Sequence, residues 1–220
     1  MLPWPNKMSD LERTAGSVIV CGFQGTEAPE RVREWLDAEI VAGLILFKRN
    51  IQDLEQARAL IATCHDASRA SLPLLMCVDQ EGGRVARFRE PLLRLPPMRH
   101  LAAAGDTELT RSAAKALGQQ LRALGINLDF APVLDVDTNP ANPVINVRAW
   151  GEDPVTVGHL ARAFLVGAQE EGVLCCAKHF PGHGDTSGDS HLELPRLAHD
   201  RSRLEAVELP PFREAIAADV

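Results

Sequence analysis

The densest group of chemically useful side chains lies between Lys178 and His191, in the segment KHFPGHGDTSGDSH. Within it, Asp189 stands two residues before His191. An Asp close to a His can orient the imidazole, fix its tautomer and stabilise its protonated form, which is the arrangement that general acid/base catalysis exploits. The glycines of the segment would let this pair swing over a bound substrate and exclude water. We therefore interpret the segment first as an acid/base loop.

Two other interpretations of this segment stay open on residue chemistry alone. One is a zinc-type site, because imidazoles and carboxylates are dense here: His179, His183, Asp185, Asp189 and His191. The other is a solvated polar loop without chemistry. The pattern favours acid/base catalysis somewhat over a metal hydrolase, with the solvated loop behind both.

A second group of charged side chains begins at Asp79, in the segment DQEGGRV, and is completed by Arg87. Two carboxylates and two arginines at the carboxyl end of a strand lie where barrel enzymes hold their substrates. The paired glycines allow a sharp turn beside a ligand. A solvated turn with a structural ion pair explains the same residues equally well.

Between these two groups lie Asp135, Asp137 and Arg148. The two aspartates alone do not supply the three or more ligands that a metal site needs, so we predict hydrogen-bonding structural roles for them. Arg148 is the better functional candidate, because its planar guanidinium suits an oxygen-rich ligand. Trp150 suits either core packing or a platform for a sugar ring, and core packing is the default prediction.

Five short apolar runs position these side chains. Each run is hydrophobic nearly throughout, as a parallel strand covered on both faces requires. The runs comprise residues 17–22, 42–47, 72–78, 127–134 and 173–178. Helical patterns separate them, at residues 32–40, 54–64, 106–124 and 153–172. A fifth helix is predicted to begin near Asp200 and to be broken at Pro210-Pro211.

Five βα units in sequence predict a parallel sheet, either in a doubly wound open sheet or in part of a barrel. The polar groups follow successive strands and do not cluster at one switch point, which favours a barrel. A complete (β/α)8 barrel takes about 250 residues. We therefore predict an α/β fold of the (β/α)8 TIM-barrel type that is incomplete, with about five βα units in a single domain over residues 1–220.

Composition narrows the class of partner. The formal net charge is -7 and the sequence pI is about 5.5, so nucleic acid and anionic membrane surfaces are unfavourable partners. Residues 1–10 lack the apolar core of a secretory signal, and no 18-residue apolar run is present. The five cysteines are odd in number and mostly lie in apolar runs, which indicates reduced thiols. A cytoplasmic location is the default prediction.

The motifs resemble those of the family 3 glycoside hydrolases, and specifically their single-domain bacterial β-N-acetylglucosaminidases, the peptidoglycan-recycling β-hexosaminidases. The resemblance runs from residue 43 onward and rests on DQEGGRV, FAPVLDVD from Phe130, and KHFPGHG with the Asp-Ser-His of residues 189–191. The last motif is highly specific, since the β-glucosidases of the wider family lack the Asp-Ser-His loop. One departure is that Asn-Val precedes Arg148 and Ala-Trp follows it, where the family often has Gly-Asp and Ser-Phe.

This resemblance implies a retaining glycosidase that needs no metal or cofactor and that removes terminal β-linked N-acetylglucosamine from peptidoglycan (muropeptide) fragments. His191 would be its general acid/base, and Asp189 would orient that imidazole. The implied substrate-binding residues are Asp79, Arg87, Arg148, Lys178 and His179.

The resemblance also places the nucleophilic Asp on a later strand, after Val220, so we expect this chain alone to be inactive. The alternatives are a family 3 β-glucosidase of broader specificity and a catalytically inactive fragment.

Overall fold

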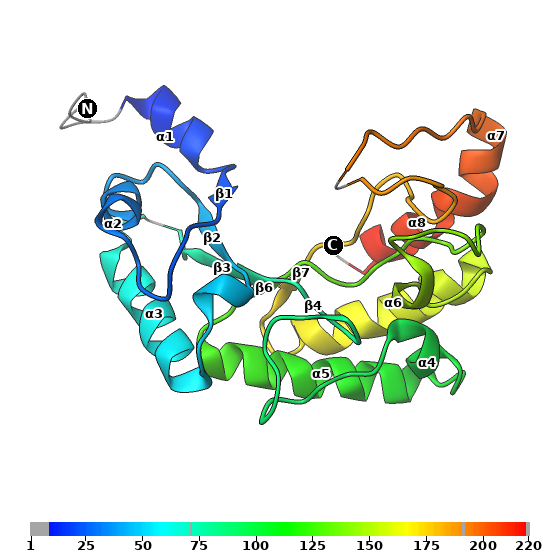
Figure 1. The fold of residues 1–220 in the computed structure, drawn as a ribbon, viewed down its shortest axis with the longest axis horizontal. Coiled ribbons are helices and arrows are strands. Elements are labelled where there is room, and N and C mark those ends of the chain that lie inside the picture. Colours follow the sequence, from blue (N-terminus) through cyan, green and yellow to red (C-terminus); the bar gives the residue numbers. More distant parts are fainter. Residues whose placement is uncertain (1–8, 71, 191, 219–220) are drawn as a thin grey trace. The chain divides into compact units, whose positions relative to one another are not determined.

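The computed structural model describes residues 9–70, 72–190 and 192–218. The chain divides into two compact units, Met1–Val78 with Ala123–Leu128 and Asp79–Arg122 with Asp129–Val220. The single domain predicted over residues 1–220 stays a prediction, since compact units can lie within one domain. Figure 1 shows both units and labels most of their helices and strands.

The first unit contains three parallel strands, β1 (Val20–Cys21), β2 (Gly43–Leu46) and β3 (Leu75–Val78). Val20 is opposite Gly43, and β2 pairs with β3 from Gly43 and Leu75 to Leu46 and Val78. The side chain of Asn127 continues this pairing, since it accepts from the Met76 N–H at 2.8 Å. All three predicted strands are therefore confirmed, although each is shorter than its apolar run.

Four helical elements accompany these strands. They are α1 (Asp10–Gly16), α2 (Glu30–Asp37), the short 3₁₀ turn η1 (Lys48–Asn50) and α3 (Leu54–Ala67). Two of them, α1 and α3, begin with a side-chain cap. Asp53 caps α3 by accepting from the Gln56 N–H at 2.8 Å. The sequence analysis missed α1, which begins with a capping box between Ser9 and Glu12. The core side chains of this unit include Leu36, Leu44, Leu46, Ile61 and Met76.

The second unit contains β7 (Leu174–Cys175) and the end of β6 (Leu128–Asp129), whose first residue belongs to the first unit. The Cys176 N–H donates to the Asp129 carbonyl at 3.0 Å, and an isolated parallel bridge joins Val133 to Lys178. The sheet order is β1-β2-β3-β6-β7, which follows the chain. Sequential order is that of a barrel and not of a doubly wound sheet, so the predicted partial (β/α)8 fold is supported by the topology.

The other elements of the second unit are two small strands and a set of helices. β4 (Gln80–Gly82) and β5 (Val85–Ala86) are antiparallel and, with α4 (Met98–Ala102), were not predicted. The helices α5 (Thr107–Leu124) and α6 (Pro154–Gln169) confirm two predictions, and Figure 1 shows them lying along each other. The chain then forms η2 (Asn146–Arg148), before α6, and α7 (Arg201–Arg203), the π-helical η3 (Leu204–Glu208) and α8 (Pro210–Ile216) after it.

Several local signals act as predicted in these helices. Asp153 caps α6 by accepting from the Thr156 N–H at 2.8 Å, and Gly125 and Gly172 follow α5 and α6 with φ of 92° and 73°. A new helix, α8, begins at Pro210, as the predicted break requires. None of the described helices is long and apolar enough to cross a membrane.

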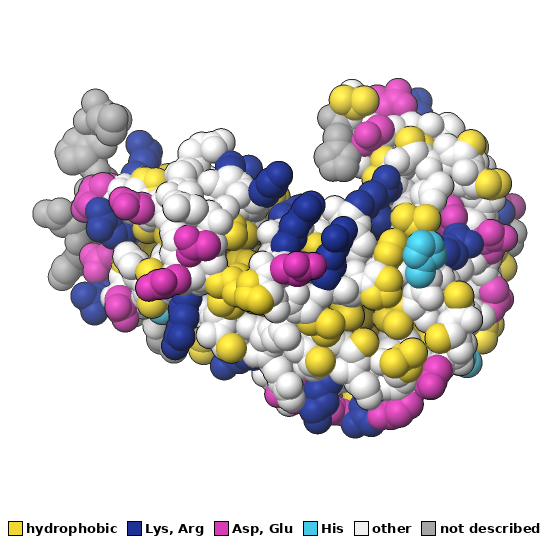
Figure 2. All heavy atoms as spheres, turned by 60° about the horizontal axis from the view of Figure 1, so that its bottom comes forward, with side chains coloured by type: hydrophobic (Ala, Val, Ile, Leu, Met, Phe, Trp, Pro, Cys, Tyr) yellow, Lys and Arg dark blue, Asp and Glu magenta, His cyan; other side chains and the backbone are white. Residues whose placement is uncertain are grey.

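The cysteines and the surface charges also bear on the sequence predictions. All five cysteines are free thiols, and Cys64 and Cys77 are buried, whereas the other three are only partly buried. Figure 2 shows Asp and Glu side chains beside Lys and Arg side chains over the face that it presents. The acidic side chains that give the chain its formal net charge of -7 are thus not gathered in one patch of that face.

Candidate functional site

The charged side chains that follow three strand ends meet in the second unit. Asp79 comes directly after β3, Asp135 follows the stretch that bridges to Lys178, and Lys178 and His179 follow β7. Because parallel strands place their carboxyl ends at one edge of a sheet, residues distant in sequence can converge there. The hydrogen bonds among these side chains show that they do.

Asp79 binds two cations. Its Oδ1 accepts from Lys178 Nζ at 2.8 Å, and its Oδ2 accepts from Arg87 Nη2 at 3.1 Å. All three side chains are largely buried but keep some exposure, from 14% for Lys178 to 25% for Arg87. Three of the five predicted substrate-binding residues therefore form one partly accessible cluster.

Glu81 extends this cluster to Arg148. Arg148 donates from Nε and Nη2 to the two carboxylate oxygens of Glu81, each at 2.8 Å, and Lys178 Nζ lies 2.6 Å from Glu81 Oε1. A two-point pair of this kind fixes the plane of the guanidinium. Glu81 is buried and was not among the predicted site residues, although it lies in the motif that contains Asp79.

The cations decide the protonation states of the two carboxyl groups. Burial by itself raises the pKa of Asp79, but Lys178 and Arg87 outweigh it and hold that pKa below its usual range. Burial also opposes ionisation of Glu81, and the hydrogen bonds of Arg148 with the charge of Lys178 bring its pKa below the usual value. Both groups are therefore carboxylates at neutral pH.

A third carboxyl group, Asp129, lies near this cluster without a direct cationic contact. Its Oδ1 accepts from the Gln80 N–H at 2.9 Å, and the side chain is fully buried. Burial raises the pKa of Asp129 to about 7, although the Gln80 N–H and Lys178 act in the opposite direction. The cluster thus lies near the carboxyl group of Asp129, whose pKa is close to neutral pH.

Asp135 holds His179, the fifth predicted substrate-binding residue. Asp135 Oδ2 lies 2.6 Å from His179 Nδ1, and Oδ1 accepts from the backbone N–H groups of His179 at 3.2 Å and of His183 at 2.7 Å. His179 Nε2 lies 3.3 Å from Arg148 Nη2. The predicted structural role of Asp135 is confirmed, and it joins His179 to the cluster.

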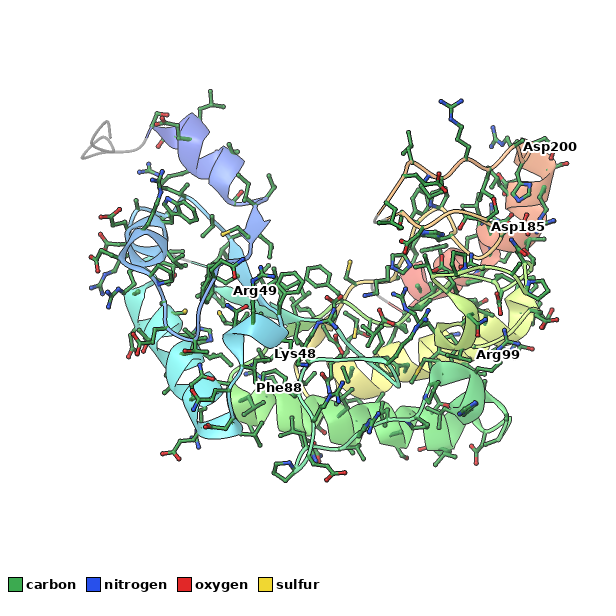
Figure 3. All side chains as sticks on the ribbon, in the orientation of Figure 1. Lys48, Arg49, Phe88, Arg99, Asp185 and Asp200 are labelled. Carbon is green, nitrogen blue, oxygen red and sulfur yellow. The ribbon has the colours of Figure 1, made fainter. Side chains whose placement is uncertain are left out.

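Asp137 and Trp150 are structural, as predicted. Asp137 pairs with Arg99, whose guanidinium also contacts Glu152 at 3.2 Å. Trp150 is buried and packs edge-on against Phe164 with the ring centroids 6.1 Å apart. Figure 3 labels Arg99.

The loop that carries the predicted acid/base pair is anchored at its start. The Asn142 amide donates to the carbonyls of His183 at 2.8 Å and Gly184 at 3.1 Å. Gly184 lets the loop lie directly against the backbone of Val136, since a Cβ there would collide with the Val136 carbonyl oxygen. Any side chain at position 184 would push the loop away from the strand end.

Asp189 is described and His191 lies outside the described residues. Asp189 is partly buried, and its carbonyl accepts from the N–H groups of Leu192 and Glu193 at 2.9 and 3.0 Å. The catalytic roles of Asp189 and His191 therefore stay predictions.

The base of the same loop contains a contact that the sequence analysis missed. His199 Nε2 lies 2.8 Å from Asp185 Oδ2, although the sequence offered no partner for this imidazole. Figure 3 shows Asp185 on the loop and Asp200, next to His199, at the start of α7. The signal for the pair was weak because fourteen residues separate its members.

Two described members of the proposed zinc set, His183 and Asp185, are hydrogen-bonded to other side chains. His183 uses Nδ1 toward the Thr186 hydroxyl and Nε2 toward Ser190 Oγ at 3.0 Å. Asp185 accepts from the Thr138 hydroxyl at 2.9 Å. Within residues 9–70, 72–190 and 192–218 there is no group of three His, Cys, Asp or Glu side chains arranged to hold a metal ion.

Comparison with known proteins gives these residues a family. The model of the glycosyl hydrolase family 3 N-terminal domain matches residues 6–220. The chain belongs to glycosyl hydrolase family 3. A β-hexosaminidase from Alkalilimnicola ehrlichii is 43% identical over 201 residues, which are 89% of this chain and 57% of that protein.

Two solved structures of this family are similar. The β-N-acetylglucosaminidase from Paenibacillus sp. str. FPU-7 is 44% identical with a TM-score of 0.90, over 96% of this chain and 40% of that one. NagZ from Neisseria gonorrhoeae, solved with N-trifluoroacetyl-D-glucosamine, is 36% identical with a TM-score of 0.82, over 90% and 59%. The chain thus covers less than two thirds of each of these relatives. The family and the partial barrel predicted from the sequence are confirmed.

Proposed function

We propose that this chain is the sugar-binding N-terminal part of a retaining β-N-acetylglucosaminidase. Terminal β-linked N-acetylglucosamine is the sugar that we propose is released by hydrolysis. Muropeptide fragments in the cytoplasm are the proposed substrates. The observation that supports this most strongly is the convergence of Asp79, Arg87, Arg148, Lys178 and His179 in one connected, partly accessible cluster.

The cluster suits an uncharged, hydroxyl-rich ligand. Asp79 accepts hydrogen bonds, while Lys178 and Arg148 donate them, so adjacent hydroxyls of a pyranose can find both kinds of partner. The ion pairs hold these side chains in place before a ligand arrives. Binding then costs less side-chain entropy than it would in a mobile site.

The proposed chemistry follows the retaining scheme. His191, oriented by Asp189, protonates the glycosidic oxygen, and a carboxylate nucleophile expected from a later strand attacks the anomeric carbon. The C–O bond to the leaving group breaks as the bond to the carboxylate forms. His191 then takes a proton from water, which displaces the enzyme carboxylate and releases the sugar.

Sugar binding by the 220-residue chain tests the first half of this proposal. N-acetylglucosamine is titrated into the chain and followed by backbone NMR shifts, with glucose as the comparison sugar. Lys178→Met is expected to weaken binding at least tenfold, since a charged hydrogen bond is worth about 1.5–3 kcal/mol. The matched control is Lys115→Met, because Lys115 also pairs with a carboxylate, Glu170 at 3.1 Å, but lies on α5 outside the cluster. Equal affinities of the two folded variants would contradict the proposal.

Hydrolysis tests the second half. In a version extended through the remaining strands, His191→Ala is expected to reduce release of nitrophenol from its β-N-acetylglucosaminide sharply. The parallel assay on the β-glucoside separates an N-acetylglucosaminidase from a glucosidase of broader specificity. Unchanged turnover in the variant would remove His191 from the mechanism.

A further inference from the structure

Asp135 is a buried carboxyl group surrounded by hydrogen-bond donors. It is completely inaccessible to solvent and lies at a strand end of the second unit. Two backbone N–H groups point at its Oδ1, those of His179 and His183. Because an N–H can only donate, Oδ1 is an acceptor, and only Oδ2 is left to meet the imidazole of His179.

The contact between Asp135 Oδ2 and His179 Nδ1 permits two proton positions. Either Nδ1–H donates to a carboxylate, or a protonated carboxyl group donates to a bare Nδ1. The 2.6 Å distance fits both. The other end of the ring distinguishes between them, because the two neutral tautomers of histidine differ in which nitrogen accepts.

Arg148 lies at that other end. Its Nη2 is 3.3 Å from His179 Nε2, and a guanidinium has donors only. Nε2 must therefore accept, which leaves the proton on Nδ1. Arg148 cannot turn away to relieve a donor facing a donor, because Glu81 binds it at two points and the Val144 carbonyl accepts from Nη1 at 3.2 Å.

We infer that Asp135 is a positioning residue that fixes His179 as the Nδ1–H tautomer and presents Nε2 as an acceptor. The side chain of Asp135 touches no ligand itself, since it is fully buried. Nε2 has a single lone pair, which accepts from Arg148 Nη2. The tautomer therefore holds the guanidinium in the position from which its remaining N–H can reach a ligand oxygen. This last step rests on the proposed sugar-binding function, whereas the tautomer does not.

The test is long-range ¹H–¹⁵N NMR of the imidazoles in the 220-residue chain. The chain has seven histidines, so the signals can be separated, and His179→Asn identifies the one of interest. The expected result at neutral pH is a protonated-type Nδ1 shift and an acceptor-type Nε2 shift for His179. An Nε2–H tautomer, or a ring that exchanges between both forms, would overturn the inference.

Asp135→Asn tests the cause of the tautomer. The amide oxygen replaces Oδ1 as acceptor of the two backbone N–H groups, so the amide nitrogen must donate to Nδ1. His179 is then expected to change to the Nε2–H tautomer, in which it faces Arg148 with a donor. A His179 that keeps its Nδ1 proton in this variant would show that Asp135 does not set it.

The matched control is Asp137→Asn. Asp137 is also buried and lies two residues further along, but it pairs with Arg99 and not with an imidazole. His179 is expected to keep the wild-type tautomer in this variant. If Asp135→Asn does not fold, the wild-type spectrum still decides the inference.

A sugar titration of the same samples separates the inference from the proposed function. N-acetylglucosamine is expected to bind at least tenfold more weakly to Asp135→Asn than to Asp137→Asn, because His179 then faces Arg148 with a donor and displaces the guanidinium proposed to bind the sugar. Absence of binding to the wild-type chain would count against the proposed function and leave the tautomer result standing. A changed tautomer with unchanged affinity would contradict the role of His179 in holding Arg148 for the ligand.

Discussion

Two strand-end turns of the molecule are held by opposite kinds of side chain. After β2 in the first unit, the amide of Asn50 accepts from the Phe47 N–H at 2.9 Å and donates to the carbonyls of Phe23 and Gly25 at 3.1 and 2.8 Å. Figure 3 labels its neighbours Lys48 and Arg49. In the second unit, the turn after β3 contains a carboxylate instead, and Glu81 binds Arg148 and Lys178. We call the turn with Asn50 the neutral turn and the turn with Glu81 the charged turn.

The difference between these turns is informative about function. An amide supplies both donors and acceptors, so Asn50 satisfies its turn without charge and is fully buried. A buried carboxylate needs cations, and burying ion pairs seldom adds stability over an apolar core. Charge at a strand end where an amide would suffice supports the ligand-binding role proposed for this turn.

The largest expected effect comes from breaking the charged turn. Glu81→Gln is expected to lower the free energy of unfolding by roughly 3 kcal/mol, because Arg148 and Lys178 keep their charges in a buried place without their main partner. Urea denaturation measures this loss.

The matched control is Glu170→Gln. Glu170 also binds two cations, Arg111 and Lys115, but on the helix surface, where solvent screens the pairs. Its loss is expected to be clearly smaller. Equal losses in the two variants would mean that burial does not distinguish the charged turn.

The next effect comes from placing a charge in the neutral turn. Asn50→Asp puts a carboxylate oxygen against the carbonyls of Phe23 and Gly25, in place of the nitrogen that donates to both. We expect a loss of about 2 kcal/mol in the free energy of unfolding, measured by urea denaturation. Gln52→Glu makes the same charge change on an exposed side chain of this turn and is expected to cost little. A harmless Asn50→Asp would contradict the contrast between the turns.

The last prediction concerns the pH dependence of stability and the carboxyl group of Asp129. Its pKa is raised to about 7 in the folded chain, against about 3.9 in an unfolded one, so the folded state holds more protons between these values. The free energy of unfolding should therefore fall as pH rises from about 4 to about 7, by up to about 1.4 kcal/mol per pH unit. Asp129→Asn is expected to flatten this slope while its amide oxygen still accepts from Gln80.

The control for this slope is Asp153→Asn. The Thr156 hydroxyl and N–H lower the pKa of Asp153 in the folded chain. The carboxyl group is therefore ionised above about pH 5 in both the folded and the unfolded chain. Asp79 and Glu81, whose pKa values also lie below the usual range, affect the free energy of unfolding only at the acid end of this window, where their unfolded forms titrate, and in the opposite direction. A slope that survives Asp129→Asn would assign the proton to another group.

The sequence predicts the framework of this molecule well, because periodicity and caps are local. The run at residues 42–47 contains β2, and Asp153 with Pro154 starts α6. The run at residues 127–134 was predicted as one strand, but β6 comprises only Leu128–Asp129. The later part of the run contacts residues 176–178 through an isolated bridge at Val133 and a few backbone hydrogen bonds. Hydrophobicity records that a segment is buried and not how far it stays in register.

The site divides in the same way. Asp79, Lys178 and Arg148 were found from residue type, strand position and family resemblance, and the structure brings them together. Glu81 was missed because its partner Arg148 lies 67 residues away, and spacing cannot show which carboxylate meets which guanidinium. Asp135 was predicted to be structural, but its link to His179 depends on the geometry of two strand ends.

The ion pair between Arg148 and Glu81 limits the number of N–H hydrogens that these side chains can donate to a ligand. Arg148 has five N–H hydrogens, and in the described chain four are taken, by Glu81 twice, His179 and the Val144 carbonyl. Lys178 has three, and two go to Asp79 and Glu81. One spare hydrogen therefore remains on each cation. A ligand with two oxygens at the right separation can accept these two hydrogens while every ion pair stays intact. A ligand that needs more donors from these two side chains must first break one of their ion pairs.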